Sequence, residues 1–224
     1  MSSLIDESLK AVVMQRFTNM IEPVTLKVFS SKNHCLFCNE MISLVNAVGE
    51  LSDKISVEIC NCDEDDPKAK KYGIERHPAI AIDGDDDYGI RFYGVPAGKE
   101  FTTFVESIML VSSRKPVLSP EAEDLLKKVT KKVNLKVFVT LECPYCPAMV
   151  LRAHKLALAN DNITAEMIES SQFAQLAADF DIFGVPNTII NNGNGSVEGL
   201  VTEEVLLNEI LRVLEQKGEK SPFT

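Results

Sequence analysis

Apolar and polar positions along the first half of the chain predict alternating helices and strands. Apolar residues spaced three and four apart predict a helix over Leu4–Met20. A strand is predicted over Val24–Ser30, another over Ile55–Cys60 where apolar and polar residues alternate, and a helix between them. Pro67 near its start and Gly73 at its end indicate a short third helix. A hairpin and a helix complete this half, and they are predicted over Pro78–Ile82, Ile90–Tyr93 and Glu100–Val111.

The second half repeats this order after a polar segment that contains Pro116. Ser119 and Pro120 form a typical helix start, with serine as the N-cap and proline at the first helical position. Each half is therefore predicted to be α/β, a mixed sheet of four strands flanked by helices. The predicted elements of the second half are Glu121–Lys132, Leu135–Thr140, Ala148–Asn160, Ile163–Ile168, Gln172–Phe180, Thr188–Ile190, Ser196–Glu198 and Glu203–Glu215.

Short motifs repeat at the same spacing. Cys35-Leu36-Phe37-Cys38 follows a strand that contains Leu-Lys-Val-Phe, and Cys143-Pro144-Tyr145-Cys146 follows a second copy of those four residues. The offset of 143 − 35 = 108 residues also separates Pro78 from Pro186. Duplication at domain length predicts two units, residues 1–115 and 116–224.

Composition restricts the classes of function. The 224 residues carry a formal charge of −10, which disfavours nucleic acid and anionic membranes as partners. Apolar residues make up 45% of the chain, but no apolar run approaches the roughly 20 residues that span a bilayer. Since no secretory signal is visible either, we expect a cytoplasmic location. In that compartment a Cys-x-x-Cys pair is typically redox-active or metal-binding rather than a permanent disulfide.

The two Cys-x-x-Cys motifs are the candidate catalytic sites. Each lies between a strand and a helix, where backbone N–H groups at the helix start lower the pKa of a thiol. Cys143 and Cys35 are therefore the predicted nucleophiles, and Cys146 and Cys38 the cysteines that resolve the mixed disulfide. No nucleotide or flavin motif is present, so no cofactor is predicted and electrons must come from a partner protein or a small thiol.

Other cysteines and two histidines leave alternatives open. The Cys-x-x-Cys pairs lie too far apart in sequence for a zinc ribbon, and we predict no metal site. Cys60 and Cys62 end a strand with their side chains on one face, either as ordinary thiols or as a regulatory disulfide. His34 and His77 are either structural or exposed, or they stabilise a Cys35 thiolate when protonated.

Two further motifs complete a family resemblance. Arg76-His77-Pro78-Ala79 and Gly184-Val185-Pro186-Asn187 follow the dithiols as in the thioredoxin fold, and Cys-Pro-Tyr-Cys is the glutaredoxin form of its motif. The whole chain resembles the glutaredoxin-like protein disulfide oxidoreductases, a prokaryotic family with two tandem thioredoxin-fold units. This resemblance implies that both prolines are cis. It also implies that Pro186, Val185, Pro78 and His77 bind extended substrate segments.

The resemblance implies thiol–disulfide exchange on protein substrates: reduction, oxidation and isomerisation, with electrons from a thioredoxin reductase. We expect the Cys143/Cys146 site to be dominant, because it carries the glutaredoxin motif. One alternative is an electron carrier between a thioredoxin reductase and a peroxiredoxin-type acceptor, and another is a holdase with idle cysteines. No acidic residue in the strand before either dithiol matches the buried carboxylate of thioredoxin, so we expect the proton acceptor to be a residue elsewhere or water.

Overall fold

The structure is a computed structural model, and it describes residues 5–31, 35–63 and 65–216. Helices and strands follow in the predicted order. The first half comprises α1 (Glu7–Phe17), β1 (Val24–Ser30), α2 (Cys38–Gly49), β2 (Ile55–Asn61), α3 (Pro67–Tyr72), β3 (Ala79–Asp83), β4 (Asp87–Tyr93) and α4 (Glu100–Ser113). The second comprises α5 (Pro120–Leu126), β5 (Val133–Val139), α6 (Cys146–Ala159), β6 (Ile163–Glu169), α7 (Ala174–Asp179), β7 (Asn187–Ile190), β8 (Gly195–Glu198) and α8 (Glu203–Gln216).

All described strands belong to one eight-stranded sheet, in the order β2-β1-β3-β4-β6-β5-β7-β8. Within each half the pairing is that of a mixed four-stranded sheet, with one parallel and two antiparallel pairs. The halves join through a parallel pair of β4 and β6, in which Ile90 lies opposite Ala165 and Tyr93 opposite Ile168. The two predicted sheets are therefore continuous.

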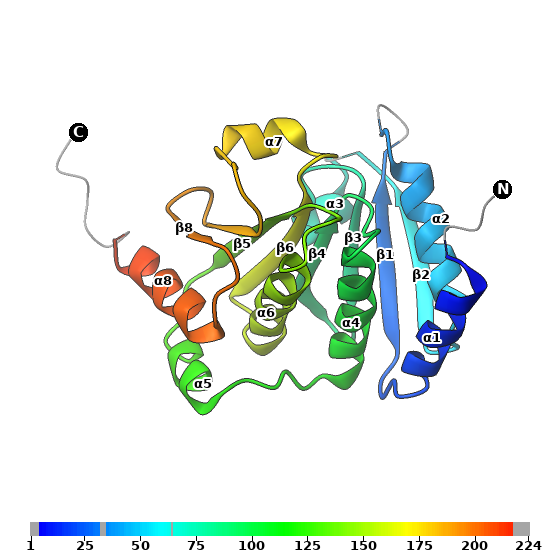
Figure 1. Cartoon of the computed structure of the whole chain (residues 1–224), viewed down its shortest axis with the longest axis horizontal. Coiled ribbons are helices and arrows are strands. Elements are labelled where there is room, and N and C mark those ends of the chain that lie inside the picture. The colour runs from blue at the N-terminus through cyan, green and yellow to red at the C-terminus, as the bar shows by residue number, and fades with distance from the viewer. Residues whose placement is uncertain (1–4, 32–34, 64, 217–224) are drawn as a thin grey trace.

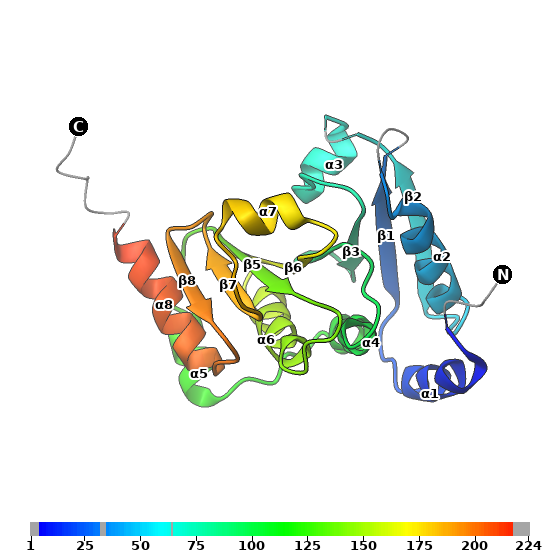
Figure 2. The same ribbon diagram turned by 45° about the horizontal axis from the view of Figure 1, so that its top comes forward.

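Helices cover both faces of this sheet. Along β3, Ile80 and Ile82 belong to a large core that includes α2, α4, α6 and α8, whereas Ala79 and Ala81 belong to a smaller core with α3 and α7. This alternation follows from the two-residue period of a strand. Figure 1 shows α4 and α6 side by side across the middle of the molecule. The turned view in Figure 2 shows α3 and α7 along the upper side of the sheet.

Local sequence signals explain several helix ends. Gly73 ends α3 in the left-handed region, with φ of 63°, and the Ser119 hydroxyl accepts the Ala122 N–H at 3.1 Å at the start of α5. Helix α5 ends at Leu126, six residues before the predicted end. The Asn160 side chain donates to the carbonyl oxygens of Leu126 and Val129 at 3.1 and 3.0 Å, and so satisfies the acceptors that a longer helix would have used.

The topology brings the two dithiols to the same end of the sheet, where β1 and β5 finish. Strand β1 is antiparallel to β3, β3 is antiparallel to β4, and β4, β6 and β5 are parallel. The strands β1 and β5 therefore point the same way, and the loops that leave their carboxyl ends carry Cys35 and Cys143. Within the described ranges, no helix is long and apolar enough to cross a membrane.

Candidate active site

The C-terminal dithiol lies between β5 and α6. Its two sulfur atoms are bonded in the structure, and Cys146 is the first residue of α6. The two cysteines differ in exposure, since Cys143 retains 8% of its surface and Cys146 none. Of the two residues, only Cys143 therefore has surface open to an external disulfide, and that surface is small. This asymmetry suits an attacking and a resolving thiol.

Backbone groups surround the Cys143 sulfur. The N–H of Cys146 points at the Cys143 Sγ at 3.2 Å, and the carbonyl oxygen of Val185 lies 3.8 Å from the same atom. An N–H donor at the start of a helix favours the negative charge of a thiolate. The Val185–Pro186 peptide is cis, as the family resemblance implies. Cys143, Cys146, Val185 and Pro186 thus form one site.

The rim of this site is apolar and exposed. Tyr145, between the two cysteines, is 62% exposed, and Phe183, two residues before Val185, is 94% exposed. Exposed aromatic side chains beside a reactive group are typical of surfaces that bind another protein. Hydrophobic periodicity does not predict the exposure of Phe183, because this residue lies in the loop between α7 and β7.

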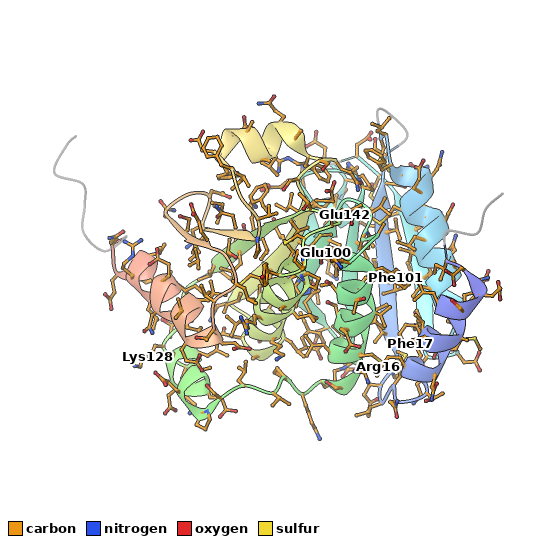
Figure 3. All side chains as sticks on the ribbon, in the orientation of Figure 1. Arg16, Phe17, Glu100, Phe101, Lys128 and Glu142 are labelled. Atoms are coloured by element: carbon orange, nitrogen blue, oxygen red, sulfur yellow. A yellow bond between two sulfur atoms is a disulfide. The ribbon has the colours of Figure 1, made fainter. Side chains whose placement is uncertain are left out.

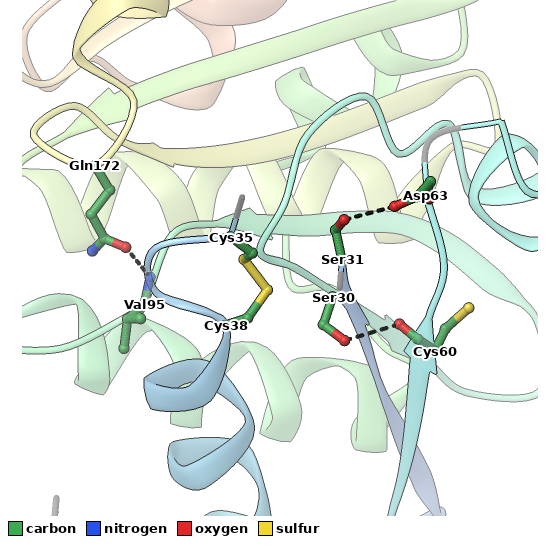
Figure 4. Close-up of a disulfide and its surroundings, with 8 residues drawn as sticks. All are labelled: Ser30, Ser31, Cys35, Cys38, Cys60, Asp63, Val95 and Gln172. Carbon is green, nitrogen blue, oxygen red and sulfur yellow. Dashed lines mark hydrogen bonds between the residues drawn. A yellow bond between two sulfur atoms is a disulfide. The ribbon is translucent and has the colours of Figure 1, made fainter. Parts of the chain in front are cut away.

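The N-terminal dithiol has the same framework. Cys35 and Cys38 are joined by a disulfide at the start of α2, with Cys35 partly exposed and Cys38 6% exposed. An open pocket of about 640 Å³ lies against both cysteines, and Leu36 beside it is 80% exposed. Figure 4 shows this disulfide close to Ser30 and Ser31 at the end of β1.

The second proline loop lies next to this dithiol by strand register. Ala79 pairs with Phe29 at the end of β1, and the His77–Pro78 peptide before it is cis. His77 is partly buried in that loop. His34 lies outside the described residues, so its predicted part in stabilising Cys35 stays a prediction.

Glu100 is a buried acid that the sequence did not single out. It begins α4 and is fully buried, and its carboxylate oxygens make no hydrogen bond of normal geometry among the described residues. Burial raises the pKa of Glu100 by more than the nearby Thr103 hydroxyl lowers it, to about 7. The preceding residue, Lys99, donates its N–H to the carbonyl oxygen of Leu141 at 2.9 Å, two residues before Cys143. Figure 3 shows Glu100 at the end of α4 that faces the loop of Glu142.

Glu100 therefore lies on the N-terminal half, one residue away from a backbone contact with the loop that leads to Cys143. Phe101 and Phe104, which follow it on α4, share one hydrophobic core with Cys143 and Cys146. No acid lies in the strand before either dithiol, whereas the structure buries one at the start of α4, a helix of the preceding unit. A helix-start glutamate normally faces solvent, so only the packing of α4 against α6 reveals its burial.

His154 is the other buried titratable group near this junction. Its side chain is fully buried on α6, and its Nδ1 lies 2.8 Å from the Ser107 hydroxyl of α4. Burial lowers the pKa of His154 to about 3, so the ring is neutral near pH 7. His154 thus connects α4 to α6 as a structural residue.

Comparison with known proteins supports the fold and the class. A family model described as a thioredoxin domain matches residues 133–212. An NADH dehydrogenase of Bacillus subtilis is 28% identical over 205 residues, which cover 91% of this chain and 37% of that protein. An alkyl hydroperoxide reductase subunit of Staphylococcus epidermidis is 27% identical over 171 residues, 74% of this chain and 31% of that protein. The chain thus spans roughly a third of the length of these curated relatives.

Solved structures match along nearly the whole chain. A protein disulfide oxidoreductase of Aeropyrum pernix superposes with a TM-score of 0.85 and 27% identity, over 96% of this chain and 95% of that one. AhpF, an alkyl hydroperoxide reductase component of Enterococcus faecalis, superposes with a TM-score of 0.84 and 27% identity, over 92% of this chain and 99% of that one. By structure and similarity, the chain is a thioredoxin-fold protein of the thiol–disulfide oxidoreductase class, with two tandem units that each carry a Cys-x-x-Cys pair.

Proposed function

We propose that the chain reduces disulfides and oxidises thiols of protein substrates, and that the Cys143/Cys146 site is the dominant one. The observation that carries the redox proposal is the asymmetry within each pair, with Cys143 8% exposed beside a fully buried Cys146, and Cys35 partly exposed beside a buried Cys38. A disulfide staple would need no such difference in access. The ranking of the two sites rests on the Cys-Pro-Tyr-Cys motif of the second. The location we propose is the reducing cytoplasm, where the pair would be cycled rather than kept oxidised.

In the reductive direction, the Cys143 thiolate attacks one sulfur of the substrate disulfide. A mixed disulfide forms, and the other substrate sulfur leaves as a thiolate that takes a proton from solvent. Cys146 then loses its proton and attacks the Cys143 sulfur, which releases the second substrate thiol. The chain ends with the Cys143–Cys146 disulfide, having given two electrons to the substrate.

The second step needs a proton acceptor, because Cys146 is fully buried. Glu100 is suited to this task, since its pKa of about 7 lets the carboxyl exchange a proton near neutral pH. It lies on α4, which packs against α6, the helix that begins with Cys146. We assign Glu100 as the candidate acceptor, acting directly or through one water.

Extended segments of protein are the substrates that suit the rim. The backbone of Val185 faces the Cys143 sulfur, and Phe183 and Tyr145 offer exposed aromatic surface on either side. An extended chain would pair with the backbone of Val185 beside Pro186, and His77 and Pro78 would serve the first dithiol in the same way. Electrons would come from a thioredoxin reductase or a small dithiol.

Activity of matched variants tests the ranking of the two sites. We expect Cys143→Ser to remove most reduction of a generic protein disulfide such as insulin, and Cys35→Ser to leave most of it. Because both are single serine substitutions of the first cysteine in the motif, each controls for the other. The reverse ranking would place the dominant site in the N-terminal unit, and wild-type activity in a variant that carries both substitutions would refute redox catalysis.

The similarity to components of alkyl hydroperoxide reductases favours a second candidate. In this version the chain carries electrons from a thioredoxin reductase to a peroxiredoxin-type acceptor rather than to many substrates. Steady-state rates with a peroxiredoxin and with insulin distinguish the two. A kcat/KM for the peroxiredoxin many times that for insulin would establish the carrier, whereas comparable values would support a general oxidoreductase.

We propose that each of the two units, residues 1–115 and 116–224, acts as a separate redox module. Each unit would hold one dithiol and one proline loop, and the shared sheet would keep both dithiols at the same end of its strands. Separate redox titration of each dithiol, in variants with the other pair replaced by serine, would show whether the units have different potentials.

A further inference from the structure

A third cysteine pair lies at the same end of the sheet as the two dithiols and belongs to neither of them. Cys60 and Cys62 flank the end of β2, and their sulfur atoms are within bonding distance in the structure. Their segment is anchored to β1, since the Cys62 N–H donates to the Ser30 carbonyl oxygen at 2.9 Å and the Ser30 hydroxyl donates to that of Cys60 at 3.3 Å. Figure 4 shows the Cys60 sulfur turned away from the Cys35–Cys38 disulfide.

A carboxylate completes this cluster. One oxygen of Asp66 and the sulfur atoms of Cys60 and Cys62 all lie within 4.8 Å of one another. Asp66 is the N-cap of α3, and its Oδ1 accepts the Lys68 N–H at 2.8 Å, which fixes the carboxylate in place. Cys62 is 7% exposed, while Cys60 and Asp66 are partly exposed, so solvent reaches the cluster.

The carboxylate distinguishes this pair from the two dithiols. A carboxylate oxygen lies within 4.8 Å of both sulfur atoms of this pair. The Cys143 sulfur instead receives a backbone N–H, which favours the thiolate. Two thiolates and one carboxylate held this close together repel one another. A bound cation would cancel that repulsion.

We propose that, once Cys60 and Cys62 are reduced, Cys60, Cys62 and Asp66 bind a thiophilic divalent cation of the zinc class. The four cysteines of the Cys-x-x-Cys motifs take no part in this site. The site is independent of the function proposed above and does not rest on it.

The geometry fits a tetrahedral ion. With bonds of about 2.3 Å to sulfur and 2.0 Å to oxygen, the ligand atoms of such an ion lie about 3.5–3.8 Å apart. The Asp66 oxygen needs to move by only about an ångström to reach that spacing, and the sulfurs separate once their bond is broken. Three protein ligands leave the fourth position to water. Oxygen-only ions such as Ca²⁺ are disfavoured, because two of the three ligands are thiolates.

Oxidation would expel the ion. Two metal-bound thiolates that react with a small-molecule disulfide form the Cys60–Cys62 bond, and their two electrons pass to the disulfide, which takes two protons from solvent and becomes two thiols. The cation then keeps only the Asp66 carboxylate and water as ligands. It dissociates because these bind it too weakly. The cluster is thus a cation site under reducing conditions and a disulfide under oxidising ones.

Zinc titration of the full chain tests the site. In a variant with Cys35, Cys38, Cys143 and Cys146 replaced by serine and reduced with a phosphine, we expect one Zn²⁺ per chain in competition with a chromophoric chelator. Further replacement of Cys60 and Cys62 by serine should abolish binding. Equal zinc binding by the variants with and without Cys60 and Cys62 would overturn the proposal, as would no binding by either.

Two aspartate variants test the third ligand. Asp66→Asn should weaken zinc affinity at least about tenfold, the scale of losses when groups supporting a metal site are removed. Asparagine is as good an N-cap as aspartate, so α3 keeps its start. Asp65→Asn is the control, because it removes the same charge one residue earlier on a fully exposed side chain. Equal affinity of these two variants would overturn the assignment of Asp66.

The redox step has its own readout. Glutathione disulfide added to the zinc-loaded four-serine variant should release one Zn²⁺ per chain as two protein thiols disappear, with the Cys60–Cys62 bond found by mass spectrometry. Zinc that stays bound after this disulfide has formed would overturn the exchange.

Discussion

Glu100 makes stability depend on pH in a way that can be calculated. The pKa of about 7, against a reference of 4.5, corresponds to about 3 kcal/mol of preference for the neutral carboxyl in the folded chain. Below pH 4.5 both the folded and the unfolded chain keep this proton. Between pH 4.5 and 7 the unfolded chain loses it first, so the free energy of unfolding falls as pH rises. Above pH 7 the loss is complete.

Glu100→Gln removes this titration while preserving the shape of the side chain. We expect the variant to match the wild type near pH 4.5 and to exceed its free energy of unfolding by about 3 kcal/mol near pH 8.5. Urea denaturation of the oxidised proteins, followed by circular dichroism, measures this difference at both pH values. Oxidation keeps the cysteines from titrating, and other groups cancel between variant and wild type.

Glu142→Gln provides the control, because Glu142 is an exposed carboxyl on the loop that Lys99 contacts through Leu141. It should leave the pH dependence of the wild type unchanged. Parallel curves of unfolding free energy against pH for wild type and Glu100→Gln would refute the burial argument, and with it the assignment of Glu100 as proton acceptor.

Three further changes have defined outcomes. Gly98→Ala should destabilise the chain by about 1–3 kcal/mol and slow the C-terminal dithiol more than the N-terminal one, because Gly98 has φ of 55° and an added Cβ would lie 2.7 Å from the Leu141 carbonyl oxygen; urea denaturation and site-specific activity measure both, and equal slowing of the sites would contradict it. His154→Gln should reduce the loss of unfolding free energy as pH falls from 6.5 towards 3, since the buried ring resists protonation; denaturation at pH 6.5 and 4 tests this, and an unchanged loss counts against it. Phe183→Ala should raise KM for insulin but not for a small disulfide, because this 94% exposed ring would contact only a protein substrate; equal effects on both substrates would show that it does not bind protein.

Sequence patterns predicted what is local in this fold. Strand β1 has the predicted bounds, Gly73 ends α3 as its position indicated, and both proline loops contain a cis peptide. These features depend on residues close together in the chain, whose hydrophobic period, backbone freedom or motif can be read directly.

Long-range contacts could not be predicted in the same way. The pairing of β4 with β6 depends on which sheet edge finds a partner, and neither strand carries a signal for that choice. Glu100 occupies a position where acids usually face water, and its burial results from the packing of a helix from one unit against a helix from the other. The approach of Asp66 to Cys60 and Cys62 depends on how α3 folds back after β2.

Trapping of a mixed disulfide tests the assigned roles of the C-terminal cysteines most directly. The measurement uses Cys146→Ser and Cys143→Ser variants, both with Cys35 and Cys38 replaced by serine, reacted with a protein disulfide and mapped by mass spectrometry. We predict a stable adduct on Cys143 in the first variant, and little or none on the buried Cys146 in the second. An adduct that forms as readily on Cys146, or no adduct on Cys143, would contradict the account.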